Sequence, residues 1–215
     1  MLVAGLDEVG RGSIAGPLLV VAASFEVASW SWDGKTWDKC RAATPCPVEG
    51  VKDSKAYSSR TRRAAVAALL DAEPSLVGKG LGVVTSRDID RYGMGKAIHR
   101  AFLRALAGLP SVPDLLLVDG DTPIKPWTGK QHARPKADRD WWPVSAASVL
   151  AKVMRDGWMV NLDRTYPGYG WSENMGYGTP AHIAALQDLG VTPIHRAQFV
   201  RSALQTKASK EDSWG

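Results

Sequence analysis

Cysteine and histidine are scarce in this chain, which has two cysteines and four histidines in 215 residues. Cys40 and Cys46 lie close together, and no matching His or Cys pair accompanies them, so we expect reduced thiols and no zinc site. No apolar run is long enough to span a bilayer, and the first residues lack the basic segment and cleavage pattern of a signal peptide. We therefore expect a cytoplasmic protein that makes no use of a membrane.

The composition is ordinary for a globular protein, with 45% hydrophobic and 23% charged residues. The length fits one domain with a full core, and the sequence shows neither internal repeats nor an inter-domain linker. The net charge of +5 is compatible with a nucleic-acid partner but does not require one. We expect a single domain and, by default, a monomer.

The stretch Gly5–Gly16, GLDEVGRGSIAG, carries the first chemical signal. The continuous apolar lead Met1–Leu6 predicts a strand buried on both faces, and it runs directly into Asp7 and Glu8. Carboxylates at the end of a core strand are costly to desolvate unless a cation meets them, and the following Gly-Arg-Gly suits close approach to a phosphate. Metal-assisted phosphodiester chemistry is one reading; a solvated hairpin turn is the other.

Apolar segments alternate with helical patterns along the rest of the chain. Further strands are expected at Pro17–Phe25, Leu81–Thr85 and Leu115–Val118, and helices at Arg60–Ala72, from Ser86 or Asp88 to about Ala107, from Pro143 through the sequence VSAASVLAKVMRDGWMVNLDRTY, and at about Pro180–Leu189. This alternation predicts an α/β domain with a mixed sheet. Residues 26–51, rich in Trp, show neither period and are expected to form a surface insert, and residues 201–215 a polar, disordered tail.

Two more acids occur in a similar context to the first pair. Asp119 ends the apolar strand LLLV, at the carboxyl end where open α/β sheets place their ligands, and Asp138 lies just before the long helix. Four crowded carboxylates repel one another, and hard divalent cations relieve that repulsion, so all-oxygen ligands predict Mg²⁺ or Mn²⁺. Adjacent residues on a regular strand face opposite ways, so Asp7 and Glu8 both point inward only if the strand bends.

Several ordered motifs together resemble ribonuclease HII, the type 2 ribonuclease H, from about Leu2 to Phe199. They are GLDEVGRGSIAGP, the DSK of Asp53 to Lys55, the VDG of Val118 to Gly120, the KAD of Lys136 to Asp138, the SAASVLAKVMRD of Ser145 to Asp156, YPGYG at Tyr166 to Gly170, GYGT at Gly176 to Thr179 and PIHR at Pro193 to Arg196. The N-terminal extension expected of type HIII enzymes is missing, which favours type HII.

The resemblance implies a ribonuclease H-like fold over residues 1–200, in which helices flank a mixed central sheet and a small helical portion lies at the C-terminus. It implies hydrolysis of the RNA strand of RNA/DNA hybrids and incision on the 5′ side of a single ribonucleotide embedded in duplex DNA, leaving 3′-hydroxyl and 5′-phosphate ends. Two Mg²⁺ or Mn²⁺ ions would serve this reaction in the active complex.

The resemblance also assigns roles to individual residues. The metal-binding, catalytic carboxylates would be Asp7, Glu8, Asp119 and Asp138. Gly10, Arg11 and Gly12 would contact the 2′-hydroxyl and phosphates of the ribonucleotide, Tyr177 would stack on the following deoxyribose, and Ser54, Lys55 and Lys152 are candidates for phosphate contacts. The 2′-hydroxyl is the group that separates RNA from DNA at a given position, so a sensor for it makes physical sense.

Some alternatives stay open at this point. Asp140 and Asp156 lie near enough in the sequence to compete with Asp138 for the fourth carboxylate, and only the family spacing to the SAAS motif favours Asp138. Ser54 and Lys55 precede a helix. They would either hold a phosphate at the start of that helix or simply cap and solvate a turn. The function could also be that of another two-metal nuclease of the same fold, such as a resolvase, or of an inactive nucleic-acid-binding relative.

Overall fold

A computed structural model of the chain describes residues 1–31, 41–42, 45–51 and 57–211. The chain divides into two compact units, each of which is described by itself. The first unit comprises Met1–Val9, Leu19–Val83 and His99–Val153, and the second comprises Gly10–Leu18, Val84–Ile98 and the chain from Met154 onward. None of the helices in the described ranges has the length and apolar content to cross a membrane.

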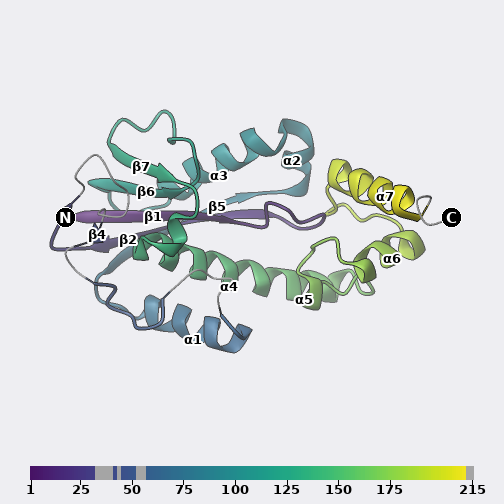
Figure 1. Ribbon diagram of the computed structural model, residues 1–215, viewed down its shortest axis with the longest axis horizontal. Helices are drawn as coiled ribbons and strands as arrows, with labels where there is room; N and C mark the ends of the chain where they lie inside the picture. The colour runs from purple at the N-terminus through teal and green to yellow at the C-terminus, as the bar shows by residue number, and fades with distance from the viewer. Residues whose placement is uncertain (32–40, 43–44, 52–56, 212–215) are drawn as a thin grey trace. The chain divides into compact units, whose positions relative to one another are not determined.

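A five-stranded sheet forms the centre of the first unit, with the strand order β5-β2-β1-β6-β7 (Figure 1). Its strands are β1 (Leu2–Val9), β2 (Leu18–Glu26), β5 (Leu76–Val84), β6 (Leu115–Asp119) and β7 (Lys130–Arg134). β1 pairs antiparallel with β2 and parallel with β6, and β6 pairs parallel with β7. The sheet is therefore mixed, as the sequence predicts.

The register of the two central parallel strands decides where their acids lie. Leu6 on β1 pairs with Val118 on β6. Both strands are buried over their apolar stretches, as continuous apolar sequence predicts for strands covered on two faces. The residues that follow this pair, Asp7 and Asp119, leave the core at the same edge of the sheet.

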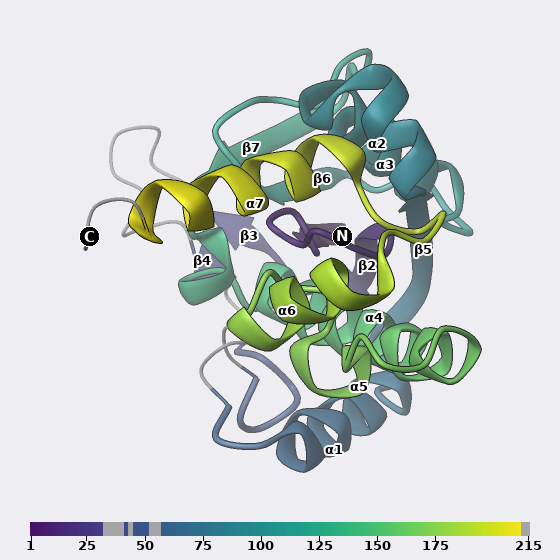
Figure 2. The ribbon, with the colours of Figure 1, turned by 90° about the vertical axis from the view of Figure 1, so that its right-hand side faces the viewer.

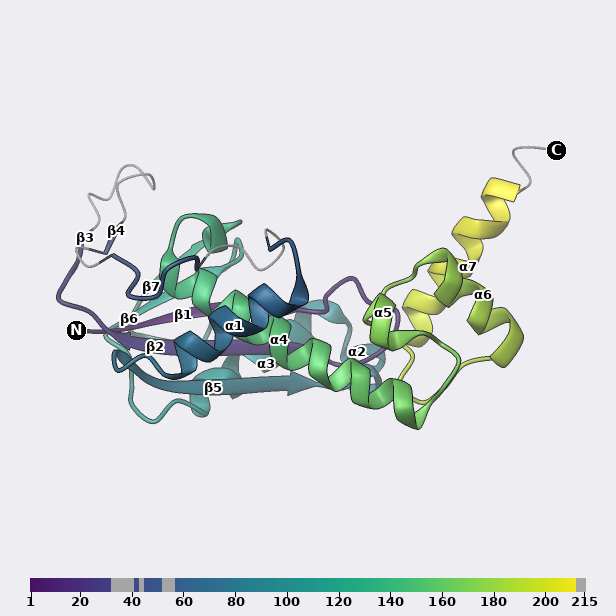
Figure 3. The ribbon, with the colours of Figure 1, turned by 90° about the horizontal axis from the view of Figure 1, so that it is seen from below.

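Helices cover both faces of this sheet. α3 (Met94–Ala107), from His99 on, lies on one face, and α1 (Arg60–Asp71) and the first half of α4 (Trp142–Thr165) lie on the other (Figures 1 and 3). Glycines allow both approaches: a Cβ on Gly82 would lie 1.8 Å from the Ala101 carbonyl oxygen on α3, and a Cβ on Gly5 would lie 2.1 Å from the Pro143 carbonyl carbon on α4. The close approach to Gly5 brings the start of α4 directly against β1, beside Asp7.

The second unit is mainly helical and has its own apolar core. It contains α2 (Ser86–Tyr92), α5 (Trp171–Asn174), α6 (Pro180–Leu189) and α7 (Ala197–Glu211). The fully buried Trp171 stacks on Tyr169 with 5.1 Å between ring centroids, and Met159 and Ile183 pack in the same cluster. Figure 2 shows α5, α6 and α7 around the loop that follows β1, and Ile14 and Ala15 of that loop belong to this core.

Some helices and strands begin or end at residues other than those that the sequence predicts. The helix expected up to Ala107 is divided at Gly93, which has a φ of 78° and separates α2 from α3. β5 begins at Leu76, before the expected Leu81, because its glycines at 78 and 80 hide the strand period. β7 lies in a basic segment that we did not interpret as a strand, since an edge strand need not be apolar.

The insert and the tail also contain regular structure. Trp30–Ser31 and Arg41–Ala42 pair antiparallel as β3 and β4, within the segment 26–51 that showed no strand period. α7 extends to Glu211, so residues 201–211 are helical where we expected a disordered tail; the polar composition of this stretch matched a tail but does not oppose helix formation. The prediction of one domain over residues 1–200 stays a prediction.

Candidate active site

Three carboxylates converge at the edge of the sheet in the first unit. Asp7, Asp119 and Asp138 each offer a carboxylate oxygen, and these atoms all lie within 4.8 Å of one another. Asp7 and Asp138 are buried and Asp119 is half-buried. Asp7 and Asp119 come from the parallel strands β1 and β6, and Asp138 from a short 3₁₀ helix, η3 (Ala137–Arg139). The group is large enough and close enough to hold a metal ion.

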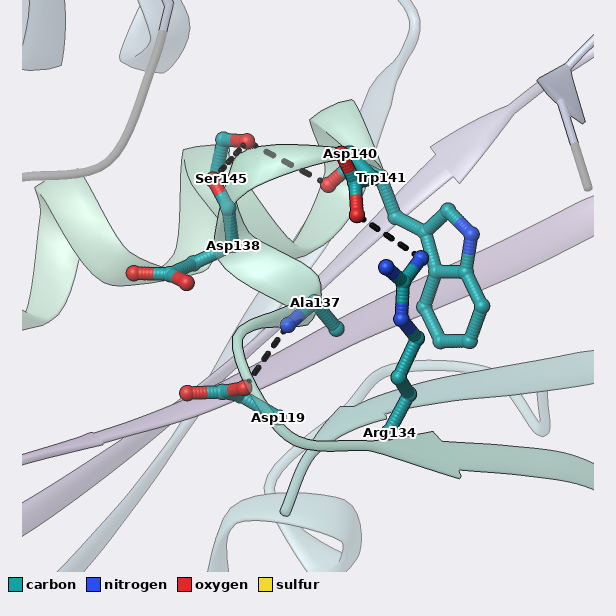
Figure 4. Close-up of polar contacts among 7 residues, drawn as sticks. All are labelled: Asp119, Arg134, Ala137, Asp138, Asp140, Trp141 and Ser145. Atoms are coloured by element: carbon teal, nitrogen blue, oxygen red, sulfur yellow. Dashed lines mark hydrogen bonds and ion pairs between the residues drawn. The ribbon is translucent and has the colours of Figure 1, made fainter. Parts of the chain in front are cut away.

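Hydrogen bonds fix this group from the chain around it (Figure 4). The Ala137 amide donates to Asp119 Oδ1 at 2.8 Å, which ties the end of β6 to the start of η3. The Ser145 hydroxyl on α4 donates to the Asp138 carbonyl oxygen at 2.6 Å. A strand, a 3₁₀ helix and a long helix therefore orient the two carboxylates together.

The surroundings of the Asp7 carboxylate disfavour its charge. Burial raises its pKa well above the usual value, and the charges of Glu8, Asp119 and Asp138 raise the pKa further, whereas a hydrogen bond from Ser148 lowers it. The Glu8 amide also donates to Asp7 Oδ1 at 2.8 Å. A divalent cation would offset this repulsion, and a set of carboxylate oxygens without nitrogen or sulfur donors fits Mg²⁺ or Mn²⁺.

The structure separates the candidates for the fourth carboxylate. Asp140 Oδ2 lies 2.7 Å from Arg134 Nη1, and Figure 4 shows it directed toward Arg134, away from the side on which the Asp119 and Asp138 carboxylates lie together. Asp156 belongs to the second unit, where its charge acts on Arg155. Of the three candidates, Asp138 is the one whose carboxylate belongs to the three-carboxylate group found among the described residues.

Glu8 is the one expected ligand that the described three-carboxylate group does not include. β1 stays regular through Val9, which pairs with Leu19, so the bend that would turn Glu8 inward is not present. Successive side chains on a regular strand project to opposite faces. Glu8 still lies close enough to Asp7 for its charge to raise the Asp7 pKa.

The expected substrate-binding residues fall mainly in the second unit. Gly10, Arg11 and Gly12 form the loop after β1, and Arg11 and Gly12 are exposed. Tyr177 is 37% exposed. Lys152 lies half-buried on α4 in the first unit, and Ser54 and Lys55 lie outside the described residues.

Two buried arginines hold that loop, and sequence reasoning missed both. The Arg155 side chain donates to the carbonyl oxygens of Pro17, Met175 and Ala15 and to the Ser13 hydroxyl, at 2.9, 2.8, 3.2 and 2.8 Å. Its guanidinium also lies 5.7 Å from the centre of the Tyr177 ring. The signal was present: Arg155 follows the buried Ala147 and Ala151 at intervals of four, which places it on the buried stripe of α4.

Arg196, the last residue of PIHR, is the second of these arginines. It is fully buried, and its side chain donates to the Gly16 and Arg11 carbonyl oxygens. Burial, and then the charge of Arg155, lower its pKa to about 9. The Arg196 guanidinium is therefore charged at neutral pH, and both arginines donate to carbonyl oxygens of the loop Gly10–Leu18.

A buried pair of histidines lies behind Tyr177. His182 Nδ1 is 2.9 Å from the Tyr177 carbonyl oxygen, and the Nε2 atoms of His182 and His195 are 3.1 Å apart. The Thr192 amide donates to His195 Nδ1 at 2.9 Å. These contacts fit a neutral pair in which His182 carries its proton on Nδ1 and His195 on Nε2.

We expect His195 to make the protein sensitive to mild acid. Burial, and then the charge of His182, lower its pKa to about 4, below the unfolded value of about 6.5, so the unfolded state takes up the proton first as the pH falls. The contribution is complete above pH ~6.5 and is lost progressively toward pH ~4, at an expected cost of about 2–3 kcal/mol.

Urea unfolding at several pH values between 7 and 4.5 measures this loss. His195→Asn serves as the matched variant, because its side-chain oxygen replaces Nδ1 as the acceptor for Thr192 but does not titrate. The wild-type protein is expected to lose more stability than His195→Asn over this range. Equal losses would show that His195 does not carry the effect.

Comparison with known proteins shows the family to which this chain belongs. The family model for ribonuclease HII matches residues 38–207. The chain is 42% identical to the ribonuclease HII of Parasynechococcus marenigrum, over 94% of this chain and 83% of that protein. The fold is similar to the ribonuclease H2 from Pyrococcus horikoshii OT3, with a TM-score of 0.72, 28% identity and coverage of 96% and 98% of the two chains. The fold is also similar to that of Bst-RNase HIII, solved in complex with Mn²⁺. The TM-score is 0.62 and the identity 19%, over 96% of this chain and 70% of that one. The chain belongs to the ribonuclease HII family, whose members are hydrolases that act on RNA–DNA hybrids.

Proposed function

We propose that this ribonuclease H incises duplex DNA on the 5′ side of a single embedded ribonucleotide, besides hydrolysing the RNA of longer hybrids. The products would carry 3′-hydroxyl and 5′-phosphate ends. The observation that carries the chemistry is the buried three-carboxylate group, whose oxygens lie within 4.8 Å of one another. A chain that only binds nucleic acid gains nothing from burying negative charges that repel both one another and the phosphates.

Asp7, Asp119 and Asp138 would hold the metal, and Glu8 would become a further ligand on a turn of the end of β1 that brings its side chain to the same face. Mg²⁺ or Mn²⁺ supplies an activated water and stabilises the leaving oxygen, and two ions would share these tasks. The complex of the structurally similar Bst-RNase HIII with Mn²⁺ supports the choice of a hard cation. The chain's own part is to fix the carboxylates: the Ala137 amide orients Asp119, and burial keeps Asp7 and Asp138 away from bulk water.

The loop Gly10–Gly12 and Tyr177 would recognise the ribonucleotide. Arg11 and Gly12 are exposed, so that the loop offers its backbone and a guanidinium to a ligand. The half-exposed ring of Tyr177 presents a flat apolar face that would pack on the deoxyribose following the ribonucleotide. Together they would distinguish the 2′-hydroxyl from its absence.

Asp119→Asn tests the metal site within this function. The asparagine retains the oxygen that accepts from the Ala137 amide but loses the charge, so we expect cleavage to fall by at least about 100-fold while duplex binding is largely kept. The assay uses an end-labelled DNA duplex with one ribonucleotide, beside an all-DNA duplex, in Mg²⁺, Mn²⁺ or a chelator. Asp140→Asn is the control, since Asp140 pairs with Arg134 and not with the three-carboxylate group.

The outcomes of this cleavage assay distinguish the proposed function from its alternatives. A metal-dependent cut 5′ of the ribonucleotide, with the all-DNA duplex intact, supports the proposal. Cutting only in long hybrids would keep the ribonuclease H activity and overturn the incision at single ribonucleotides. Unchanged cleavage by Asp119→Asn would overturn the metal-site assignment, and binding without cleavage in any metal would favour an inactive relative.

A further inference from the structure

Hydrogen bonds join the Arg196 side chain to the loop Gly10–Leu18 at several points, all within the second unit. The Nε and Nη2 atoms of Arg196 donate to the Gly16 carbonyl oxygen at 3.1 and 2.9 Å, and its Nη1 atom donates to the Arg11 carbonyl oxygen at 3.1 Å. The Arg196 amide in turn donates to the Ile14 carbonyl oxygen at 2.8 Å. A fully buried cation is therefore committed to the backbone of one loop.

The bond to Arg11 fixes one peptide group in direction. In a trans peptide the C=O and the following N–H point in opposite directions. Because the Arg11 carbonyl points to the buried guanidinium, the Gly12 amide points away from it, on a part of the loop where both residues are exposed. The amides of Ile14 and Ala15 are used differently: both donate inward to the Gly176 carbonyl oxygen, at 2.9 and 3.1 Å.

Gly12 has no internal reason to be glycine, in contrast to Gly10. A Cβ on Gly10 would lie 2.3 Å from Arg155 Nε, and Gly10 has a φ of +86°, so the fold itself requires a glycine there. A Cβ on Gly12 would meet nothing within 4 Å, and its φ lies outside the left-handed range. The missing side chain of Gly12 therefore leaves room for something outside the chain to approach the amide.

The charge behind this peptide strengthens the amide as a donor. A hydrogen bond from a guanidinium to the carbonyl polarises the peptide group, and hydrogen bonds in such a chain reinforce one another. An oxygen of a phosphate or a hydroxyl is the partner that a polarised, exposed N–H takes best. Arg196 touches no substrate in this arrangement; it acts through Gly12.

We propose that Arg196 is a positioning residue that fixes the Arg11–Gly12 peptide so that the Gly12 amide binds an oxygen of the ribonucleotide, and thereby sets the preference for a ribonucleotide over a deoxyribonucleotide. This inference rests on the proposed function and assigns its selectivity to a residue that is not a member of the three-carboxylate group. Gly12→Ala crowds the amide without straining the fold, and Arg196→Lys retains the charge but loses the fork that holds two carbonyls at once.

The test is a double-mutant cycle on binding preference. We measure the ratio of Kd values for an all-DNA duplex and the same duplex with one ribonucleotide, in Ca²⁺, where cleavage is not the readout. Each single variant is expected to lower this ratio about tenfold, the size of one charge-assisted hydrogen bond. The double variant is expected to lower it no further than about twofold beyond either single one, because both changes remove the same contact.

Arg155→Lys is the matched control. Arg155 is the other buried arginine that binds this loop, and its side chain donates to Ser13, Ala15, Pro17 and Met175. Its effect on the ratio is expected to multiply with that of Gly12→Ala. Mn²⁺ affinity is expected to be the same in Arg196→Lys and the wild-type protein, because the metal site lies in the first unit.

Two outcomes would overturn the inference. One is a Kd ratio that stays within about twofold of the wild-type value in Arg196→Lys. The other is a double variant in which the effects of Arg196→Lys and Gly12→Ala multiply to about 100-fold. Absence of any preference in the wild-type protein would instead overturn the proposed function. A further measurement needs no variant of Arg196: the NMR signal of the Gly12 amide is expected to shift on adding the ribonucleotide duplex and to shift less on adding the all-DNA duplex. Equal shifts would also overturn the inference.

Discussion

Asp7→Asn is expected to abolish cleavage and, at the same time, to raise the free energy of unfolding of the metal-free protein. Burial and the neighbouring acids raise the Asp7 pKa, so the folded state resists losing this proton more than the unfolded state does. The contribution of Asp7 to the stability of the metal-free protein is therefore most favourable below its unfolded pKa of about 3.9 and is lost as the pH rises through the folded value. At neutral pH the asparagine removes this cost, which we expect to be on the order of 1–3 kcal/mol.

Asparagine is a close replacement here, because its oxygen still accepts from the Glu8 amide. Urea unfolding in the presence of a chelator measures the stability, and Mn²⁺ titration of the folded protein measures the loss of the site. Asp121→Asn, at an exposed aspartate, controls for the general loss of a negative charge. The idea fails if Asp7→Asn is less stable than the wild-type protein without metal, since the carboxylate would then stabilise the fold by itself.

Arg155→Leu is expected to lower the free energy of unfolding by about 4 kcal/mol, and so to be among the most damaging single changes in the chain. The leucine fills part of the volume but leaves three carbonyl oxygens and the Ser13 hydroxyl without their donor. Each buried polar group left unsatisfied costs about 1–3 kcal/mol. The Tyr177 ring also loses the guanidinium beside it.

Ser13→Ala is the matched control for Arg155→Leu. It removes one acceptor and leaves the same guanidinium bound to Ala15, Pro17 and Met175, so an effect of about 1 kcal/mol is expected. Urea unfolding and limited proteolysis of the loop compare the two variants. An equal loss of free energy of unfolding in the two variants would mean that the Arg155 network stabilises the fold no more than a single hydrogen bond does.

The sequence predicts the central strands and the direction of the acids well. Short continuous apolar runs of this length are typical of strands covered on both faces, so β1, β2 and β6 stand out. The parallel pairing of β1 with β6 brings Asp7 and Asp119 to one edge. Asp138 needed the motif spacing, because nothing in its local pattern distinguishes it from Asp140. Only the ion pair between Asp140 and Arg134, a contact across the fold, separates them.

The rest depends on contacts that have no local signal. Arg196 is a charged residue in a loop segment, which a pattern of polarity places at the surface, yet it is fully buried because the Gly16 and Arg11 carbonyl oxygens, far away in the sequence, accept its hydrogen bonds. α7 lies in a polar stretch, and Asp90 of α2 accepts from its first amide, that of Ala197, at 2.9 Å. A helix cap from a residue more than a hundred positions away cannot be predicted from the local sequence pattern.

The order of the strands also constrains when the enzyme becomes active during its own synthesis. β1 can pair with β2 as soon as both have left the ribosome, since they are neighbours in sequence, but β6 follows about a hundred residues later. Asp7 thus waits, near the start of the chain, for Asp119 and Asp138 to be translated and to emerge. A nascent chain that has not reached Asp138 holds no complete three-carboxylate group and therefore lacks the site on which the proposed cleavage depends.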